Sequence, residues 1–286
     1  MELGYTVWNW MRYDFSRDIN KKDWQSCSEH PKRDFEIACK TMSDIGFYNV
    51  ECFNFITEYY DGADDEFDAL MKKYKLTFSC IYNYLTNDFE KDVKVTERCI
   101  EFMKRHGTKG KMYMNLESPK RPTDRKVTEN DYKLASEQAN VLGKMCAEAG
   151  IKLTLHPHYG TVIERQEEID YFASHTDPKY VWFCLDTAHT TINGMRPEEL
   201  FVQYADRLGY VHLKDVQPDP DHEYTLPTAQ FRALGQGTVD FVTIVKYIKQ
   251  KGFDGILCVE LDNPIVNHYE SAEYSKKYLH SVVGID

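Results

Sequence analysis

The chain has 286 residues, of which 42% are hydrophobic and 28% are charged, as expected for a globular protein that buries a large core. Its net charge of −11 argues against a nucleic-acid partner, because binding to a phosphate backbone requires a basic face. The sequence shows no signal-peptide pattern, no run of 18 apolar residues and no C-x-x-C pair among its eight cysteines, so we expect a reduced, cytoplasmic, soluble protein without a membrane partner.

Eight short runs of strand character alternate with longer segments of helical periodicity. The runs predict strands over residues 2–8, 48–53, 76–82, 110–115, 151–156, 180–186, 208–214 and 255–261. Between them, apolar residues recur at spacings of three and four, most clearly over 33–46, 131–150 and 241–252. Each of these three segments ends on a glycine, which is typical of the residue that follows a helix.

This alternation determines the predicted fold. Strands separated by helices run parallel and are joined by right-handed crossovers. Eight such units fit a closed (β/α)₈ TIM barrel, an α/β fold, with residues 1–286 as a single domain. The alternative is an open, doubly wound sheet, but no strand–GxGxxG–helix unit opens the chain. In a TIM barrel the reactive residues lie at the carboxyl ends of the strands, so these ends are where a site is expected.

Polar side chains lie at the ends of four consecutive predicted strands, the fifth to the eighth: His156, Asp186, His212 and Glu260. A lone histidine at such a position is commonly a satisfied polar residue, and a lone aspartate before a helix is commonly an N-cap. His212 and Glu260, however, stand inside apolar runs, where burial without a partner is costly. One divalent cation would satisfy all four groups, and mixed nitrogen and oxygen ligands favour Mn, Co, Zn or Fe over Mg or Ca.

Other polar and aromatic residues are candidates for the same site. Glu117 follows the fourth strand. It is expected to bind substrate hydroxyls or to contact a ligand of the metal, and the alternative is a solvated side chain. Trp8 and Trp10 follow the first strand, and aromatic faces there can line a sugar site, although core packing is the alternative for at least one of them. Glu51 is buried in the second strand.

The segment GQGTVDF, residues 235–241, contains two glycines before a predicted helix. Glycines at a helix N-terminus can bind phosphate, but a lone G-x-G more often forms a tight turn, and no cluster of Arg and Lys accompanies this one. The segment therefore favours an unphosphorylated polyol or keto-sugar as the small-molecule partner. Asp215 and Asp262, which follow the last two strands, are expected to act as local caps.

Several motifs together resemble the xylose-isomerase-like barrel superfamily, which includes sugar isomerases and epimerases, endonuclease IV and inosose dehydratase. They are HPHYGT (156–161), CLDTAH (184–189), VHLKDV (211–216), GQGTVDF (235–241) and CVELD (258–262). The resemblance covers about residues 150–262, while the first half of the chain is similar mainly in its βα rhythm and its aromatic-rich first strand.

The resemblance implies a ligand set and a departure from it. In the epimerases, Glu, Asp, His and Glu from strands five to eight hold a metal, and the positions here are His156, Asp186, His212 and Glu260. The two glutamates of the epimerases also move protons, and His156 replaces the first of them. Inosose dehydratase is more similar at this point, because it has a histidine cluster followed by Met-Gly-Thr. Whether His156 or His158 is the strand-five ligand stays open.

The predicted function is a divalent-metal-dependent enzyme that removes a proton next to the carbonyl of a keto-sugar or keto-cyclitol. Inosose-dehydratase-like dehydration is preferred, with isomerisation or epimerisation as the alternative. His158 is the leading acid or base, since histidine titrates near cytoplasmic pH, and His189 is its partner or orients a hydroxyl. Glu260 would act in proton transfer as well as bind metal, and Lys214 would neutralise an oxyanion or, alternatively, pack along the barrel rim.

The sequence disfavours two other classes of function. A barrel that has lost activity and only binds sugar conflicts with the complete ligand set. A DNA-repair nuclease conflicts with the acidic charge and with the lack of matching histidines in the first three strands. No organic cofactor is expected, and a homo-oligomer is possible.

Overall fold

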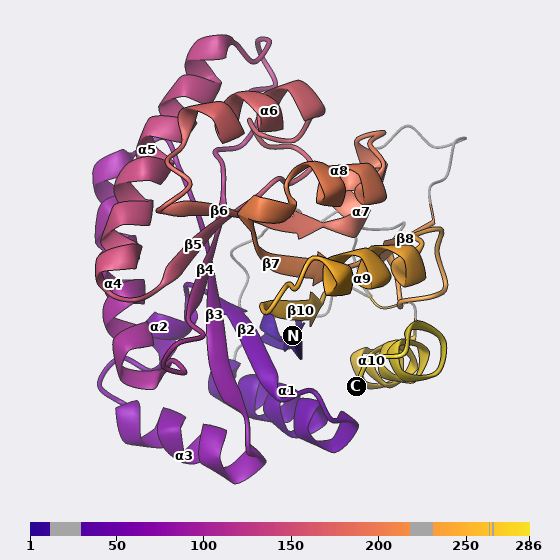
Figure 1. Cartoon of the computed structure of the whole chain (residues 1–286). Coiled ribbons are helices and arrows are strands. Elements are labelled where there is room, and N and C mark those ends of the chain that lie inside the picture. Colours follow the sequence, from indigo (N-terminus) through magenta and orange to yellow (C-terminus); the bar gives the residue numbers. More distant parts are fainter. Residues whose placement is uncertain (12–29, 218–230, 263, 265) are drawn as a thin grey trace.

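The computed structural model describes residues 1–11, 30–217, 231–262, 264 and 266–286. Eight parallel strands close into a barrel in the order β1-β10-β7-β6-β5-β4-β3-β2, with helices packed outside it (Figure 1). The strands are β1 (Glu2–Thr6), β2 (Asn49–Phe53), β3 (Thr77–Tyr84), β4 (Tyr113–Glu117), β5 (Lys152–His156), β6 (Val181–Asp186), β7 (Leu208–Leu213) and β10 (Ile256–Val259). The predicted (β/α)₈ TIM barrel is therefore confirmed.

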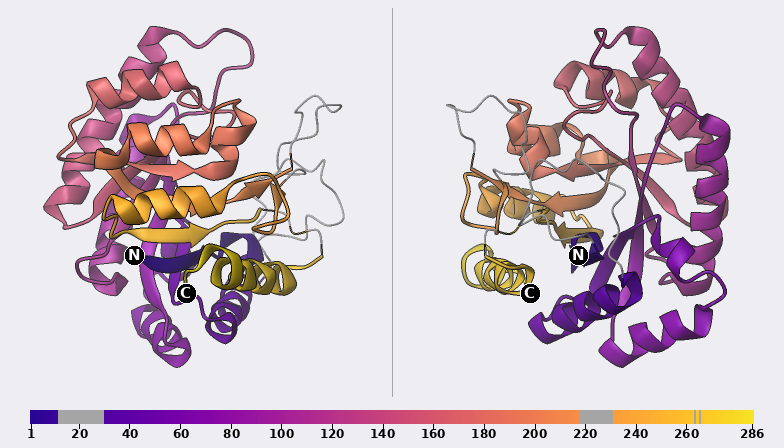
Figure 2. Two further views of the ribbon diagram at one scale, coloured as in Figure 1. Left: turned by 45° about the vertical axis from the view of Figure 1, so that its right-hand side comes forward. Right: turned by 180° about the vertical axis from the view of Figure 1, so that it is seen from behind.

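The outer layer consists of the crossover helices, which surround the strands in both views of Figure 2. They are α1 (Pro31–Ile45), α2 (Ile56–Tyr59), α3 (Asp64–Tyr74), α4 (Phe89–His106), α5 (Glu129–Glu148), α6 (Gln166–His175), α7 (Thr187–Ile192), α8 (Pro197–Gln203), α9 (Phe241–Gln250) and α10 (His268–Tyr278). The predicted closing glycines are confirmed, because Gly46, Gly150 and Gly252 follow α1, α5 and α9 with φ of +93°, +74° and +70°.

The crossovers depart from strict alternation at the carboxyl ends of the strands. Two helices follow β2 and two follow β6, and a 3₁₀ turn, η1 (Trp8–Met11), follows β1. After β7 the chain forms a small antiparallel pair, β8 (Asp215–Val216) with β9 (Phe231–Arg232). The last described strand ends at Val259, one residue before Glu260, whereas the fourth strand extends to include Glu117. These additional elements surround the end of the barrel where a site is expected.

The barrel interior is apolar at its centre and contains thiols. A compact cluster of inward-facing side chains consists of Cys80, Tyr113, Cys184, Tyr210, Ile256 and Cys258. Every cysteine among the described residues is a buried free thiol, and Cys27 lies outside the described residues. Burial raises the pKa of the Cys184 thiol to about 12, so that it stays protonated at neutral pH. None of the described helices has the length and apolar character needed to cross a membrane.

Candidate active site

The four predicted ligands meet at the carboxyl end of the barrel. His156 and Asp186 are the last residues of β5 and β6, His212 lies in β7, and Glu260 follows β10. The parallel register places Asp186 beside His212 across β6 and β7. One ligand atom from each of the four residues lies within 4.8 Å of the others, and all four side chains are buried. The strand ends of the second half of the barrel therefore converge on one point.

The four converging atoms are Nε2 of His156, Oδ2 of Asp186, Nδ1 of His212 and Oε2 of Glu260. Among the described residues, none of these atoms has a hydrogen-bond partner. Nδ1 of His212 and Oε2 of Glu260 lie 2.9 Å apart, and Nε2 of His156 lies 3.5 Å from Oδ2 of Asp186. Buried polar atoms left without partners cost free energy, and a shared cation removes that cost. The donor set of two nitrogens and two oxygens fits a Mn, Co, Zn or Fe ion.

Asp186 is both a helix N-cap and a candidate metal ligand, the two roles considered for it from the sequence. Its Oδ1 accepts a hydrogen bond of 2.8 Å from the backbone N–H of His189 and so caps α7. Its Oδ2 faces the cluster. The cap holds the carboxylate in a fixed orientation, so a helix N-terminus positions one of the four candidate ligands.

His158 and His189 lie together beside the cluster, with ring centroids 3.8 Å apart. Nδ1 of His158 lies 2.7 Å from the Tyr159 carbonyl oxygen. Burial lowers the pKa of His158 to about 4, and burial together with the charges of His158 and Lys214 lowers the pKa of His189 well below its usual value. Both imidazoles are therefore neutral at neutral pH, which a proton acceptor requires.

Lys214 lies inside the site and not along the rim, since its side chain is 0% exposed. Its ammonium lies 3.0 Å from both oxygens of Asp262, 3.5 Å from Oε1 of Glu260 and 4.2 Å from the ring centre of Phe231. Burial opposes the charge, but Asp262 and Glu260 outweigh it and raise the pKa of Lys214. The residue is a permanent buried cation beside the candidate ligands.

Asp215 and Asp262 differ from the expected helix caps. Asp262 pairs with Lys214. The carboxylate of Asp215 instead accepts hydrogen bonds from the backbone N–H groups of Val216, Gly235, Gly237 and Val239. This carboxylate occupies the position that an anion would take in the G-x-G turn, and a Cβ on Gly237 would lie 2.3 Å from its Oδ1. The segment 235–241 is therefore a turn into α9, as predicted, and its glycine is required by close approach.

Glu117 is buried and not solvated. Its Oε2 accepts a hydrogen bond of 3.0 Å from the Tyr82 hydroxyl, and its Oε1 pairs with Lys120. Burial disfavours its charge, but the nearby His158 and Lys120 hold the pKa of Glu117 at about 2. The carboxylate is consequently ionised, and it lies next to the predicted acid or base.

The two tryptophans have different surroundings. Trp8 is 2% exposed and stacks on Phe53, with ring centroids 4.9 Å apart. Phe53 stacks in turn on Tyr82 at 4.6 Å, so Trp8 belongs to an aromatic column that leads to the site. Trp10 is half-buried and packs on His268 at 4.5 Å, against the start of α10. Core packing therefore describes Trp8, and Trp10 contacts the last helix.

Three contributors were not recognised as site residues from the sequence. Tyr82 lies 3.2 Å from Nδ1 of His156, and Asn115 lies 3.3 Å from Nε2 of His212. Glu51 was identified only as a buried acid, and both of its oxygens lie 3.1 Å from Nε2 of His212. The sequence shows only that these polar residues lie within apolar strands, and this pattern does not identify their hydrogen-bond partners.

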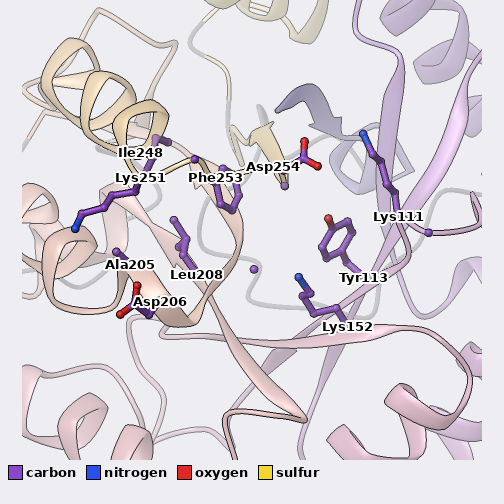
Figure 3. Close-up of a pocket in the computed structure, with 14 residues that line it drawn as sticks. Lys111, Tyr113, Lys152, Ala205, Asp206, Leu208, Ile248, Lys251, Phe253 and Asp254 are labelled. Atoms are coloured by element: carbon purple, nitrogen blue, oxygen red, sulfur yellow. The ribbon is translucent and has the colours of Figure 1, made fainter.

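A cavity of about 380 Å³ lies at the opposite, amino end of the strands (Figure 3). Its lining includes Lys111, Lys152 and Lys251, but Lys111 and Lys251 stand on opposite sides of the cavity (Figure 3). Lys152 instead lies over the Trp182 ring, 4.3 Å from its centre. These charges do not converge on a common point, and the amino end of a TIM barrel serves stability more than chemistry.

Comparisons with known proteins agree with this geometry. A family model described as "Xylose isomerase-like TIM barrel" matches residues 39–278. The inosose dehydratase of Geobacillus kaustophilus (strain HTA426) is 34% identical over 177 residues, which are 58% of this chain and 58% of that protein. The match therefore spans less than two thirds of the length of this relative.

Solved structures show the same fold at low sequence identity. The probable 3-DHS dehydratase AsbF from Bacillus anthracis has a TM-score of 0.76 and 15% identity, covering 99% of this chain and 100% of that one. The IOLI protein, solved with a binding zinc atom, has a TM-score of 0.74 and 18% identity, covering 99% of this chain and 98% of that one.

Proposed function

Because this chain belongs to the xylose isomerase-like TIM barrel family, we propose that it is a divalent-metal-dependent lyase that removes water from a keto-cyclitol or keto-sugar. The observation that carries the proposal is the convergence of four buried ligand atoms without hydrogen-bond partners. The relative named inosose dehydratase supports the substrate class, since it shares 34% identity over the aligned part.

His156, Asp186, His212 and Glu260 would hold the metal, which when bound acts as a Lewis acid on the substrate oxygens. His158 supplies the base. The Tyr159 carbonyl can only accept a hydrogen bond, so the proton of neutral His158 lies on Nδ1, and Nε2 is free to take a proton. The cation of Lys214, fixed by Asp262, lies where it can offset negative charge that develops on the substrate.

The proposed reaction is an elimination. Nε2 of His158 takes the proton from the carbon next to the carbonyl, and the electron pair of that C–H bond forms a new carbon–carbon double bond. The neighbouring C–O bond breaks, and the His158 imidazolium returns its proton to the leaving hydroxyl. One water leaves, and no oxidant or reductant is needed. His189, held against His158, would orient a substrate hydroxyl.

Isomerisation or epimerisation is the alternative reaction for the same residues. Glu260 favours it, because this glutamate corresponds to one of the pair that moves protons in the epimerases. A histidine at position 156 replaces the other glutamate of that pair, the one on strand five, and this exchange favours dehydration. The two reactions are separable by mass: dehydration lowers the mass of the product by one water, whereas epimerisation in heavy water leaves deuterium on carbon.

The test begins with metal content, measured by elemental mass spectrometry on the wild type, His156→Ala and Glu260→Ala. His175→Ala is the control, because His175 is an exposed histidine at the end of α6. We expect about one Mn, Co, Zn or Fe per chain in the wild type and the control, lost in both ligand variants. The loaded enzyme should then dehydrate an inosose. Absence of metal after reloading with Mn or Co would overturn the proposal and leave a sugar-binding barrel.

A further inference from the structure

The half of the barrel that holds no candidate ligand directs polar side chains at the two ligand histidines. Glu51 lies in β2, Tyr82 in β3, and Asn115 and Glu117 in β4. Tyr82 and Glu51 contact the ring nitrogens that face away from the cluster. Hydrogen bonds to the distal nitrogen of a histidine determine which nitrogen carries the proton and which can bind a metal.

The proton position on His212 follows from Glu51. Nε2 of His212 lies 3.1 Å from each oxygen of Glu51, and both side chains are at most 1% exposed. A nitrogen lone pair facing two carboxylate oxygens would be repelled, so Nε2 carries a proton and donates it. Nδ1 faces Oε2 of Glu260 at 2.9 Å, so without a cation between them it would carry a proton as well. With a metal bound at the cluster, Nδ1 is the nitrogen that would turn its lone pair toward it.

Asn115 fixes Glu51 in this position. The Asn115 amide nitrogen donates to Oε2 of Glu51 at 2.7 Å, and its amide oxygen accepts from the Thr154 hydroxyl at 2.5 Å. The carboxylate contact determines which end of the amide is the nitrogen, because an ionised carboxylate can only accept a hydrogen bond and the reversed amide would point an oxygen at it. Three strands therefore cooperate to orient one imidazole.

The proton position on His156 follows from a longer chain of hydrogen bonds. The Tyr82 hydroxyl lies 3.0 Å from Oε2 of Glu117 and 3.2 Å from Nδ1 of His156. A phenol has one proton to donate, and the carboxylate of Glu117, paired with Lys120, can only accept. Tyr82 therefore donates to Glu117, and Nδ1–H of His156 donates to the Tyr82 oxygen. The lone pair of His156 then lies on Nε2, facing Asp186.

We propose that Glu51 and Tyr82 are positioning residues that fix the two ligand histidines in opposite tautomers, so that each imidazole turns a free lone pair toward the cluster. The nitrogens assigned a lone pair, Nε2 of His156 and Nδ1 of His212, are the two that have no hydrogen-bond partner among the described residues. Strands β2 and β3, in the first half of the barrel, thus position ligands that the second half would supply. This inference rests on the proposed metal centre but not on the proposed reaction.

Two substitutions separate the two histidines. Glu51→Gln replaces an acceptor oxygen with an N–H₂ group, which favours a lone pair on Nε2 of His212 and a proton on Nδ1, where the metal would bind. Tyr82→Phe removes the acceptor for Nδ1–H of His156. Loss of such supporting contacts typically weakens metal binding by about 10–100-fold, and we expect a loss of that size in zinc affinity for each variant.

Matched controls come from the same barrel. Tyr210→Phe removes a hydroxyl two residues before His212, from a side chain that is 0% exposed and lies outside both hydrogen-bond chains. Glu168→Gln removes a buried carboxylate on α6 that pairs with Arg121. Both variants are expected to keep the zinc affinity within about twofold of the wild type. If Glu51→Gln does not fold, Glu51→Asp replaces it, and an intermediate loss is expected.

The direct readout is the proton position, measured by ¹⁵N–¹H correlation spectra of histidine-labelled, zinc-loaded protein. We expect the proton on Nε2 of His212 and on Nδ1 of His156, with the His212 signals changed by Glu51→Gln and the His156 signals by Tyr82→Phe. The same tautomer on both rings would overturn the inference, as would zinc affinities that match the controls.

Two further outcomes are distinguishable. Glu51, His212 and Cys258 could themselves hold a cation, so two zinc ions per chain with Glu51 as a ligand would also overturn the positioning role. If the wild type binds no zinc, the proposed metal centre fails. The spectrum of the metal-free protein then still tests whether Tyr82 fixes the tautomer of His156. A proton on Nε2 of His156 with none on Nδ1 would refute it there, and a proton on Nδ1 would support it.

Discussion

Replacing Asp215 by alanine is expected to disrupt the turn at residues 235–239 and the position of the neighbouring Lys214. The Asp215 side chain is fully buried and accepts four backbone hydrogen bonds. Its Oδ2 takes the N–H groups of Gly235 and Gly237 at 2.8 Å each, and its Oδ1 takes those of Val216 at 2.9 Å and Val239 at 3.2 Å. Alanine leaves all four donors without this acceptor.

The magnitude follows from the number of donors. A buried donor without an acceptor costs about 1–3 kcal/mol, and water that enters the vacated space recovers part of this cost. We therefore expect Asp215→Ala to lower the free energy of unfolding by about 3–5 kcal/mol. Asp215→Asn keeps one acceptor oxygen and should cost about 2 kcal/mol. Asp240→Ala, which removes only the N-cap of α9, should cost about 1 kcal/mol.

Urea unfolding of the three variants and the wild type at one pH measures these differences in the free energy of unfolding. The denaturant slopes (m values) are compared to check that all four proteins unfold in the same way. The second readout is dehydration activity, which should fall in Asp215→Ala more than in Asp240→Ala, because Lys214 precedes Asp215 in the chain. If Asp215→Ala costs no more than Asp240→Ala, the carboxylate does not organise the turn, and the reasoning fails.

Two other predictions concern the base and a helix cap. His158→Asn should lower turnover by about 10²–10⁴-fold with the metal content unchanged, and a loss of metal in this variant would instead identify His158 as a ligand. Asp131 lies in the capping box of α5, and its hydrogen bond to Arg125 lowers its pKa although burial opposes this. A lowered carboxyl pKa stabilises the fold fully above the unfolded value, so the wild type should exceed Asp131→Asn by about 1 kcal/mol at pH 7. That difference should begin to shrink below about pH 4 and be lost as the pH falls through the lowered pKa, and a difference that does not shrink below about pH 4 would refute the prediction.

The fold and the convergence of the four candidate ligands could be predicted because both depend on local patterns. Alternating strands and helices specify a barrel, and a parallel barrel brings the strand ends together whatever the details of packing. His212 and Glu260 stood out because they are polar residues inside apolar runs. The error at the fourth strand has a local cause: Gly110, predicted to start that strand, has φ of +84° and forms a turn, and the strand instead runs from Tyr113 to Glu117.

The supporting contacts could not be predicted because they join residues far apart in the sequence. Glu51 and His212 are separated by 161 positions, and Tyr82 and His156 by 74. Tyr82 lies in a strand rich in aromatic residues and looks like a core residue in the sequence. Only the register of β3 against its neighbours shows that its hydroxyl reaches His156. Asp215 was expected to act as a local cap because three of the backbone N–H groups that donate to it lie 20 to 24 positions later, in a turn whose conformation the sequence does not specify.

The histidine at position 156 changes the electrostatics of the site in a way that its neighbours offset. Two carboxylates and two neutral imidazoles would balance the charge of a divalent cation, whereas the three carboxylates of the epimerases would exceed it. In this chain two more buried carboxylates lie behind the histidines, Glu51 in direct contact with His212 and Glu117 connected to His156 through Tyr82. A carboxylate that accepts the distal N–H of a ligand histidine makes the imidazole a stronger donor to a metal, so Glu51 would strengthen His212 in this way. Negative charge at this end of the barrel thus lies outside the candidate ligand set, and the position at strand five would be left to a neutral group.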